Sequence, residues 1–299
     1  MARKLVILLT DMPELPEVET IRRYLQQKIV NKTITKINVL DKSQFHGDQK
    51  DVVNNRIVAV ERLGKVLAIK LEDKTYLNFH FKLSGQILYS NNAENAIFKN
   101  TIPLSSTNRM PGRSTRVIFY FDDGSGLFFN EMRKFGWVKY SPKIEGPKGV
   151  DILTSEFTLD YFKKNLQNTR RPVKVVLMDQ DRFAGVGNIY ANEALFDAKI
   201  NPEISANNLT IEQLNHLYKS IIKVIKHGIK YHGSSGRDEV YILSDGSKGE
   251  YQYHFLVYQQ EGKRCQRCGE VIMRIKQGGR SSFYCPECQK MLPKDELLF

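Results

Sequence analysis

The amino-acid sequence predicts a multidomain α+β protein. We expect an N-terminal antiparallel β-sandwich with a leading helix, then a helical domain, and finally a zinc-finger β-hairpin. Three observations predict this class. Apolar and polar residues alternate in short runs between residues 33 and 140, which is typical of half-buried strands. After residue 150 the apolar residues recur at helical spacing, and two Cys-x-x-Cys pairs stand near the C-terminus.

The composition is that of a globular chain long enough for two domains. Of the 299 residues 41% are hydrophobic, and no run approaches the ~18 apolar residues of a membrane-spanning helix, so we expect no membrane partner. Lysine and arginine outnumber aspartate and glutamate by 45 to 33, which gives a net charge of +12. This charge favours a polyanionic partner, because each neutralised phosphate releases condensed counterions. On charge alone, a basic protein without such a partner fits equally well.

The first twelve residues are an unusual start. Two basic residues, Arg3 and Lys4, precede five apolar residues at positions 5–9. This run is shorter than the core of a secretory signal, and no small-residue cleavage site follows it. We therefore expect a cytoplasmic or nuclear protein. In such a reducing compartment, cysteines bind metals more often than they form disulfides.

In the first half, residues 13–27 have a helical pattern with an apolar stripe at Val18, Ile21 and Leu25. Strand patterns follow at residues 67–71, 77–83, 116–121 and 127–129. The last two runs flank Asp-Asp-Gly-Ser-Gly, which is a hairpin signature. Residues 90–113 are rich in asparagine, serine and threonine, and predict a long loop.

In the second half, residues 141–150 contain two prolines and two glycines and predict a linker. Helices are expected at residues 154–165 and 172–180, the second with proline in its first turn. Thr210 and Gln213 form a capping-box pattern that begins a longer helix. The core stripe of that helix consists of Leu214, Leu217, Ile221, Ile225 and Ile229. Residues 233–249 predict a polar, glycine-rich loop.

The four cysteines carry the clearest spacing signal in the chain. Cys265 and Cys268 form one Cys-x-x-Cys pair, and Cys285 and Cys288 form the other. Two-residue spacing lets each turn direct both thiolates at one ion, and four sulfurs complete the tetrahedral coordination of Zn²⁺. Since such a site has no open position for water, we expect one structural zinc ion, and no redox or organic cofactor. The hairpin is basic and suits phosphate contacts, although a zinc ribbon could equally serve a protein contact.

Six short stretches, spread from residue 12 to about residue 290, occur in an order known from one protein family. They are residues 12–19 (MPELPEVE), Gly64-Lys65, residues 80–85 (HFKLSG), residues 133–136 (RKFG), residues 179–193 with AGVGNIY at 184–190, and the cysteine module with RSSFYC at 280–285. Together they resemble the formamidopyrimidine-DNA glycosylase/endonuclease VIII family, and more closely its formamidopyrimidine-DNA glycosylase branch. The resemblance implies a bifunctional DNA repair enzyme with a helix–two-turn–helix domain.

The resemblance also implies a division of the chain. The expected parts are an extension at residues 1–12 that is absent or removed in the active protein, a catalytic β-sandwich at 13–140, a linker at 141–150, a helical helix–two-turn–helix DNA-binding domain at 151–260, and a four-cysteine zinc-finger module at 261–299. The extension matters chemically, because Pro13 follows Met12 and its nitrogen is a tertiary amide as printed. A start at Met12 followed by ordinary methionine removal would free this nitrogen. If it stays blocked, a catalytically silent protein that binds lesions is the alternative.

By resemblance, Pro13 is the catalytic nucleophile. A terminal proline is a secondary amine, and α-amino groups titrate at about 8, so a useful fraction is neutral near pH 7. It would attack C1′ of a damaged nucleotide, expel the base and form a Schiff base. Glu14 would act as the acid and base, and Lys65 would tune proton transfers. From the residues alone, Pro-Glu-x-Pro-Glu is also an ordinary helix start.

The same resemblance implies two groups of DNA contacts. The residues expected at the phosphates are Lys65, His80, Asn188 and Arg280. The residues expected to fill or brace the hole left by the extruded base are Leu83, Arg133 and Phe135. Taken alone, His80 would be an ordinary surface histidine, and core packing is the alternative for Phe135.

The segment Gly185-Val186-Gly187 resembles a dinucleotide-binding fingerprint, but it fails that test. Tyr190 stands where the third glycine belongs, and we expect a helix rather than a strand before the segment. A glycine turn that leads into a helix can instead present backbone N–H groups to a phosphate. A simple turn between helices is compatible with the same residues.

Two departures from the family pattern leave open which lesion the protein prefers. Leu83 replaces the usual methionine, and Glu131-Met132 replaces Asp-Pro, which changes the turn that supports Arg133. We favour 8-oxoguanine and formamidopyrimidines as substrates, with oxidised pyrimidines, as for endonuclease VIII, as the alternative. We expect a monomer that acts on damaged double-stranded DNA, nucleoid-associated in a bacterium or nuclear in a eukaryote. An RNA-binding zinc protein has little beyond the net charge in its favour.

Overall fold

A computed structural model describes residues 12–236 and 240–291 of the chain. The expected extension at 1–12 therefore falls almost wholly outside the described residues, as does the end of the zinc module. The chain divides into two compact units. The first contains Pro13, Glu17–Glu145 and Tyr231–Gln252, and the second contains Glu14–Pro16, Gly146–Lys230 and the chain from Tyr253 onward. No helix within the described ranges combines the length and apolar character that a membrane crossing requires.

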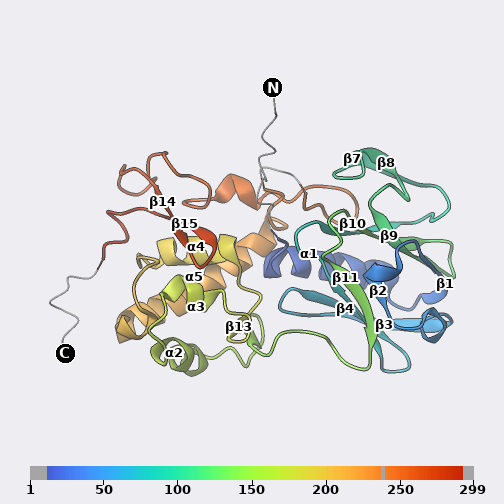
Figure 1. Cartoon of the computed structure of the whole chain (residues 1–299), viewed down its shortest axis with the longest axis horizontal. Coiled ribbons are helices and arrows are strands. Elements are labelled where there is room, and N and C mark those ends of the chain that lie inside the picture. The colour runs from blue at the N-terminus through green and yellow to red at the C-terminus, as the bar shows by residue number, and fades with distance from the viewer. Residues whose placement is uncertain (1–11, 237–239, 292–299) are drawn as a thin grey trace. The chain divides into compact units, whose positions relative to one another are not determined.

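The first unit is built on one nine-stranded sheet, and helix α1 (Leu15–Ile29) precedes its strands in the chain (Figure 1). The strand order is β2-β11-β5-β4-β3-β1-β9-β10-β6, and only β11 and β2 pair in parallel. The strands are β1 (Thr33–Val39), β2 (Phe45–His46), β3 (Asn55–Leu63), β4 (Val66–Leu71), β5 (Tyr76–His80), β6 (Gly85–Ser90), β9 (Thr115–Phe121), β10 (Gly126–Glu131) and β11 (Trp137–Ser141). Two 3-10 turns, η1 (Lys42–Gln44) and η2 (Gln49–Asp51), lie between β1 and β3.

The two halves of this sheet fold onto each other and share a core. Only two residue pairs join β1 to β3, so the sheet is narrow where its halves meet. Phe79 of β5 packs against Phe119 of β9 and Phe129 of β10, with ring centroids 5.8 and 5.9 Å apart. Helix α1 buries Val18 and Leu25 completely in the same cluster. The predicted antiparallel sandwich with a leading helix is confirmed.

The prediction of a long loop at residues 90–113 is wrong. This segment forms a hairpin of β7 (Ala96–Ile102) and β8 (Thr107–Met110). Phe98, Ile102 and Met110 bury their side chains in a second, smaller cluster with Phe128 of β10. The apolar positions are few and widely spaced, so the many polar residues between them hid the strand pattern.

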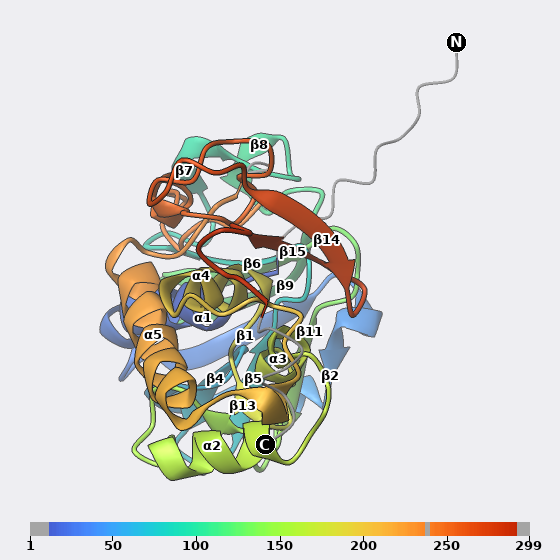
Figure 2. The same ribbon diagram turned by 90° about the vertical axis from the view of Figure 1, so that its left-hand side faces the viewer.

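The second unit is mainly helical and carries the cysteine hairpin (Figure 2). Its helices are α2 (Leu159–Gln167), α3 (Val173–Leu177), α4 (Asn188–Asp197) and α5 (Ile211–Lys230), with short 3-10 turns at η3 (Ala206–Asn208) and η4 (Tyr251–His254). Two short ladders complete it, β12 (Val150–Asp151) with β13 (Phe183–Ala184) and β14 (Met273–Gln277) with β15 (Arg280–Tyr284). The capping box is confirmed, because Thr210 N–H donates to Gln213 Oε1 at 2.9 Å and Gln213 N–H donates to Thr210 Oγ1 at 3.2 Å. The predicted stripe of α5 is buried.

Three local predictions for this unit need correction. Helix α2 begins after residue 158 rather than at 154, because Thr158 caps it by accepting from Tyr161 N–H at 3.2 Å. Helix α3 has five residues, and Pro172 is its N-cap rather than a first-turn residue. The element directly before Gly185 is the two-residue strand β13, since the helix expected there ends at Leu177.

The glycine-rich loop at residues 233–249 is only partly polar in its described residues. Val240, Tyr241 and Ile242 are buried, and Gln86 Nε2 donates to Val240 O at 2.6 Å. Glu17 of α1 fixes the start of the loop, because its Oε1 accepts from Ser234 N–H at 2.8 Å. A side chain at Gly233 would collide with Glu17, since a Cβ there would lie 2.7 Å from Glu17 Cγ.

Glu19 is the centre of a cationic cluster on α1. Its carboxylate accepts from Arg22 at 2.9 Å, Arg23 at 2.7 Å and Arg62 at 3.1 Å. Burial raises the pKa of Glu19, but the hydrogen bonds from Arg22 and Arg23 outweigh it and lower the pKa to about 2.

We expect Glu19→Gln to lower the free energy of unfolding at pH 7 by about 2 kcal/mol, because it takes the carboxylate away from half-buried Arg62. Since the folded-state pKa is depressed, this stabilisation is complete above about pH 4.5 and is lost as the pH falls towards 2. Urea unfolding at pH 7 and pH 3 measures the effect, and the gap between wild type and variant should shrink at pH 3. Glu61→Gln, which removes only an exposed pair with Lys70, is the control. An equal gap at both pH values would contradict the prediction.

Candidate functional site

Glu14 lies at the N-terminus of helix α4 and is 3% exposed. Its Oε1 accepts from Ile189 N–H at 3.0 Å, and its Oε2 lies 3.4 Å from Tyr190 N–H. These N–H groups belong to the first turn of the helix, where the positive end of the helix dipole favours a carboxylate. A Cβ at Gly187 would lie 2.1 Å from Glu14 Cδ, so only glycine leaves room for the carboxylate. The local fold therefore holds the side chain next to Pro13 in one place.

This arrangement corrects the expected role of the glycine turn. The first N–H groups of α4 were expected to face a phosphate, but the Glu14 carboxylate takes two of them. Gly185 has φ +101° and accepts from Leu15 N–H at 3.1 Å, which ties the turn to the start of α1. Asn188, the first residue of α4, is half-buried beside the carboxylate. Its side chain stays available as the donor that the sequence suggested.

Lys174 is a charged residue that the sequence did not single out. It is 1% exposed, and its Nζ donates to Ser281 O at 2.7 Å and to Ser282 Oγ at 2.8 Å. Burial lowers the pKa of Lys174 to about 7, while the Glu14 carboxylate opposes this shift and the Arg280 charge adds to it. The charge of Lys174 thus responds to both Glu14 and Arg280. A lone lysine within the apolar run Val-Lys-Val-Val-Leu was the signal that could have revealed it.

Arg280 begins strand β15 and lines a cavity of about 350 Å³ with Lys174 and Arg171. Strand β15 is held in place by Asn192 of α4, whose Oδ1 accepts from Phe283 N–H at 2.7 Å. Asp179 lines the same cavity and pairs with Arg171 at 2.8 Å, so Lys174 and Arg280 are the cations that leave the cavity attractive to an anion. In the second unit, the structure therefore places Arg280 beside Lys174, a residue that the sequence did not single out.

In the first unit, Lys65 lies in the turn just before β4, and His80 ends the neighbouring strand β5. Lys65 is 7% exposed and precedes Val66, which pairs with His80 across β4 and β5. His80 is half-buried rather than an ordinary surface histidine. Burial lowers its pKa to about 3, with the charges of Lys82 and Lys65 adding to the shift. Its Nδ1 accepts from Lys82 N–H at 3.1 Å, so at neutral pH the ring is uncharged and keeps Nε2–H as a donor.

The three residues expected to fill the DNA void lie on two turns of the first unit. Leu83 is half-buried in the turn between β5 and β6. Arg133 and Phe135 are exposed on the loop from Glu131 to Gly136, and Phe135 is 60% exposed. An aromatic ring this exposed is not a core residue, which excludes the plainer interpretation of Phe135.

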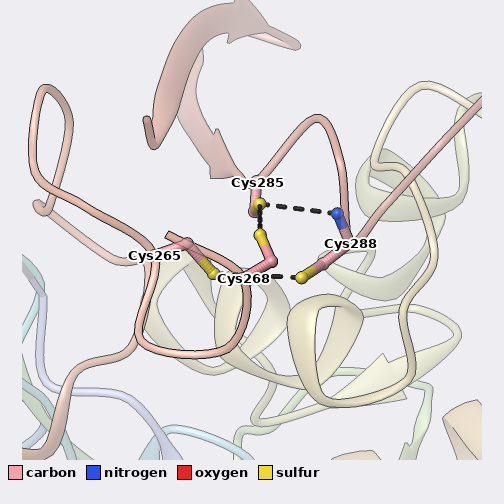
Figure 3. Close-up of side chains that lie close together, drawn as sticks. All are labelled: Cys265, Cys268, Cys285 and Cys288. Carbon is pink, nitrogen blue, oxygen red and sulfur yellow. Dashed lines mark hydrogen bonds between the residues drawn. The ribbon is translucent and has the colours of Figure 1, made fainter. Parts of the chain in front are cut away.

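The four cysteines converge at the base of the C-terminal hairpin (Figure 3). All four sulfurs lie within 4.8 Å of one another, with 3.9 Å between Cys265 and Cys288 and 3.4 Å between Cys268 and Cys285. A tetrahedral zinc site with Zn–S bonds of about 2.3 Å places its sulfurs about 3.8 Å apart. The four thiolates therefore fit one zinc ion, which would join the two Cys-x-x-Cys turns.

Three family models match consecutive parts of the chain. Residues 12–138 match the formamidopyrimidine-DNA glycosylase N-terminal domain, and residues 148–239 match the formamidopyrimidine-DNA glycosylase H2TH domain. Residues 262–290 match the zinc finger found in FPG and IleRS. The matched regions include the sandwich, the helices and the cysteine hairpin.

Whole proteins of the same kind align along nearly the full chain. The formamidopyrimidine-DNA glycosylase of Pelotomaculum thermopropionicum is 38% identical over 295 residues, which covers 94% of this chain and 100% of the relative. That of Desulforamulus reducens is 37% identical, with 93% and 99% covered. Among solved structures, the MutM (Fpg) protein of Thermus thermophilus superposes with a TM-score of 0.80 at 31% identity, covering 94% and 100%. A complex of Lactococcus lactis Fpg with abasic-site DNA gives 0.78 at 30% identity, covering 93% and 100%.

The fold, the zinc hairpin and these matches define a DNA glycosylase of mixed α+β architecture. More specifically, the chain belongs to the formamidopyrimidine-DNA glycosylase family. The predicted family, fold class and enzyme class are confirmed. The zinc-finger match and the cysteine geometry together confirm the expected structural zinc.

We expect the purified protein to carry one zinc ion per chain, and Cys268→Ser to lose it on dialysis against a chelator. Three thiolates bind zinc more weakly than four, and binding of the ion supplies folding energy to such a hairpin. Metal analysis gives the zinc content, and limited proteolysis reports opening of the hairpin. Glu287→Gln, at an exposed position between Cys285 and Cys288, is the matched control that should keep its zinc. A Cys268→Ser protein that still holds one zinc after dialysis would refute the four-thiolate site.

Proposed function

We propose that this chain removes oxidised bases from duplex DNA and then cleaves the abasic strand by β/δ-elimination. The observation that carries the proposal is the buried Glu14 carboxylate, fixed beside Pro13 by the N–H groups of α4. A nucleophile and a carboxyl acid/base on adjacent residues suit displacement at a sugar carbon. The cationic side chains of Lys174 and Arg280, which line one cavity of the second unit, suit the phosphates that flank the lesion.

The chemistry begins with the nitrogen of Pro13, which must be a free secondary amine. We therefore propose that residues 1–12 are absent from the active protein. The nitrogen forms a bond to C1′ as the C1′–base bond breaks, and the leaving base takes the electron pair and the proton that the amine nitrogen gives up. Glu14, in its acid form, protonates the sugar oxygen, so the ring opens to an iminium ion. The Glu14 carboxylate then takes the C2′ proton and the 3′ phosphate leaves, and a second elimination expels the 5′ phosphate.

The remaining residues divide into two proposed roles. Lys65, His80, Asn188 and Arg280 hold the phosphates that flank the lesion. His80 does so as a neutral donor, since its lowered pKa leaves the ring uncharged at neutral pH. Leu83, Arg133 and Phe135 occupy the space that the extruded base leaves, where Arg133 can donate to the orphaned base and Phe135 can wedge between base pairs.

For the substrate, we favour 8-oxoguanine and formamidopyrimidines. Lactococcus lactis Fpg has been solved with DNA containing Fapy-dG, at 29% identity to this chain, and MutM with DNA containing carbocyclic 8-oxo-G. The same Lactococcus lactis protein has also been solved with an oxidised pyrimidine in the DNA, which keeps pyrimidine lesions as the alternative. We propose a monomer that works in the cytoplasm on the nucleoid, as for a bacterial repair protein.

We expect borohydride, added during reaction with a lesion-containing duplex, to trap a covalent adduct between Pro13 and C1′, because it reduces the iminium bond to a stable amine. The panel should contain a formamidopyrimidine, 8-oxoguanine and an oxidised pyrimidine. Mass spectrometry of the trapped peptide defines its N-terminus. Glu14→Gln is the companion variant and should lose base excision by a factor on the order of 10² or more.

Three outcomes separate the alternatives. Absence of an adduct with every lesion rejects the glycosylase chemistry. A mass that retains residues 1–12 in protein that still cleaves DNA rejects Pro13 as the nucleophile. A protein that binds abasic DNA without turnover, and gains activity when trimmed to Pro13, supports the silent lesion-binding form instead.

A further inference from the structure

We propose that Glu131 is a positioning residue that locks together the two turns carrying Leu83, Arg133 and Phe135, so that all three enter DNA as one rigid unit. This inference rests on the proposed function and concerns how the void left by the extruded base is filled.

The carboxylate of Glu131 is the hub of the loop from Glu131 to Gly136. It lies at the end of β10 and is 0% exposed. Its Oε1 accepts from Arg133 N–H at 2.9 Å, and its Oε2 accepts from Gly136 N–H at 2.9 Å. Both ends of the loop are therefore bonded to one side chain from inside the protein.

The same carboxylate reaches the other turn through Ser84. The hydroxyl of Ser84 donates to Glu131 Oε1, and it also accepts from Arg133 N–H at 3.1 Å. Because Ser84 directly follows Leu83, the turn with Leu83 and the loop with Arg133 share one buried hydrogen-bond network. Neither turn can shift without breaking a bond to Glu131.

Contacts that do not involve Glu131 fix the middle of the loop from Glu131 to Gly136. Lys134 has φ +59°, its carbonyl accepts from Gln44 Nε2 at 3.2 Å, and its Nζ pairs with Asp41 at 2.8 Å. A Cβ at Gly136 would lie 2.6 Å from Glu131 Oε2, so no larger residue fits there. The backbone is thus held while the side chains of Arg133 and Phe135 remain in solvent.

A rigid backbone below exposed side chains has a functional consequence. Ordering a loop upon binding costs conformational entropy, and a loop that is already ordered avoids that cost. Void filling also needs side chains placed to within a fraction of an ångström. Buried Glu131 therefore contributes to insertion without contacting DNA. The usual family residue here is aspartate, whose carboxylate is one methylene shorter.

The test compares Glu131→Gln and Glu131→Asp with wild type on two substrates. The first is a lesion duplex with 2-aminopurine next to the orphaned base, whose fluorescence rises when insertion unstacks it. The second is a single-stranded oligonucleotide with an abasic site, which has no void to fill. Val138→Ala is the matched control, because Val138 is fully buried in β11 near the loop but bonds to none of the groups around Glu131.

We expect Glu131→Gln to lower the single-turnover rate of base excision in the duplex on the order of tenfold or more, while cleavage of the single strand stays within about twofold. The 2-aminopurine signal should fall in parallel, and Glu131→Asp should lie between wild type and Glu131→Gln. Val138→Ala should be less stable than wild type, but its activity should not fall more on the duplex than on the single strand.

Three results would overturn the inference: unchanged fluorescence and excision in Glu131→Gln, an equal loss on both substrates, or the same split in Val138→Ala. Failure of the proposed function looks different, because wild type itself would then be inert on every substrate. In that case the 2-aminopurine signal on binding an abasic duplex still tests whether Glu131 positions the inserted side chains. Equal signals from wild type and Glu131→Gln overturn the positioning role.

Discussion

Buried glutamate carboxylates that accept backbone N–H groups hold the irregular parts of this protein in place. Four such residues lie in the described part of the chain, and none shares a strand or a helical turn with the segment that it fixes. They are Glu14 with Ile189 and Tyr190, Glu17 with Ser234, Glu131 with Arg133 and Gly136, and Glu193 with Leu256, Val257 and Tyr258. A buried carboxylate needs several hydrogen-bond donors, and a buried loop needs acceptors for its N–H groups. A glutamate carboxylate that accepts from loop N–H groups therefore satisfies both requirements.

Glycines mark the places where these carboxylates approach the backbone. A Cβ at Gly187 would collide with Glu14, one at Gly233 with Glu17, and one at Gly136 with Glu131. In the motif that resembles a dinucleotide fingerprint, Gly187 therefore makes room for an acid of the same chain and not for a phosphate. The N-terminus of α4 thus satisfies two of its N–H groups and fixes the Glu14 carboxylate, the proposed acid and base. In the proposed function, side chains such as Asn188 and Arg280 contact the phosphates instead.

The parts of the fold that follow from local pattern were predictable, and the parts that depend on distant partners were not. Periodicity indicated the sandwich, helix α5 and its capping box, because each is determined by neighbouring residues. Cysteine spacing indicated the zinc site for the same reason. The hairpin at residues 96–110 was missed because its few apolar residues are buried against β10, which no local pattern reports. The site residues came from a family resemblance, whereas their supports, such as the bond from Ile189 to Glu14 across 175 residues, came only from the fold.

The burial of acids also alters the surface that DNA meets. Among the described residues, six acidic side chains but only two basic ones are buried. The acids are Glu14, Glu17, Glu19, Glu131, Asp151 and Glu193, and the bases are Lys65 and Lys174. Within the described residues, burial therefore removes more negative than positive charge from the surface. Because long-range attraction to a polyanion depends on the charges near the surface, the acids that fix the loops are placed where they oppose DNA binding least. The same carboxylates thus shape the site and leave its exterior cationic.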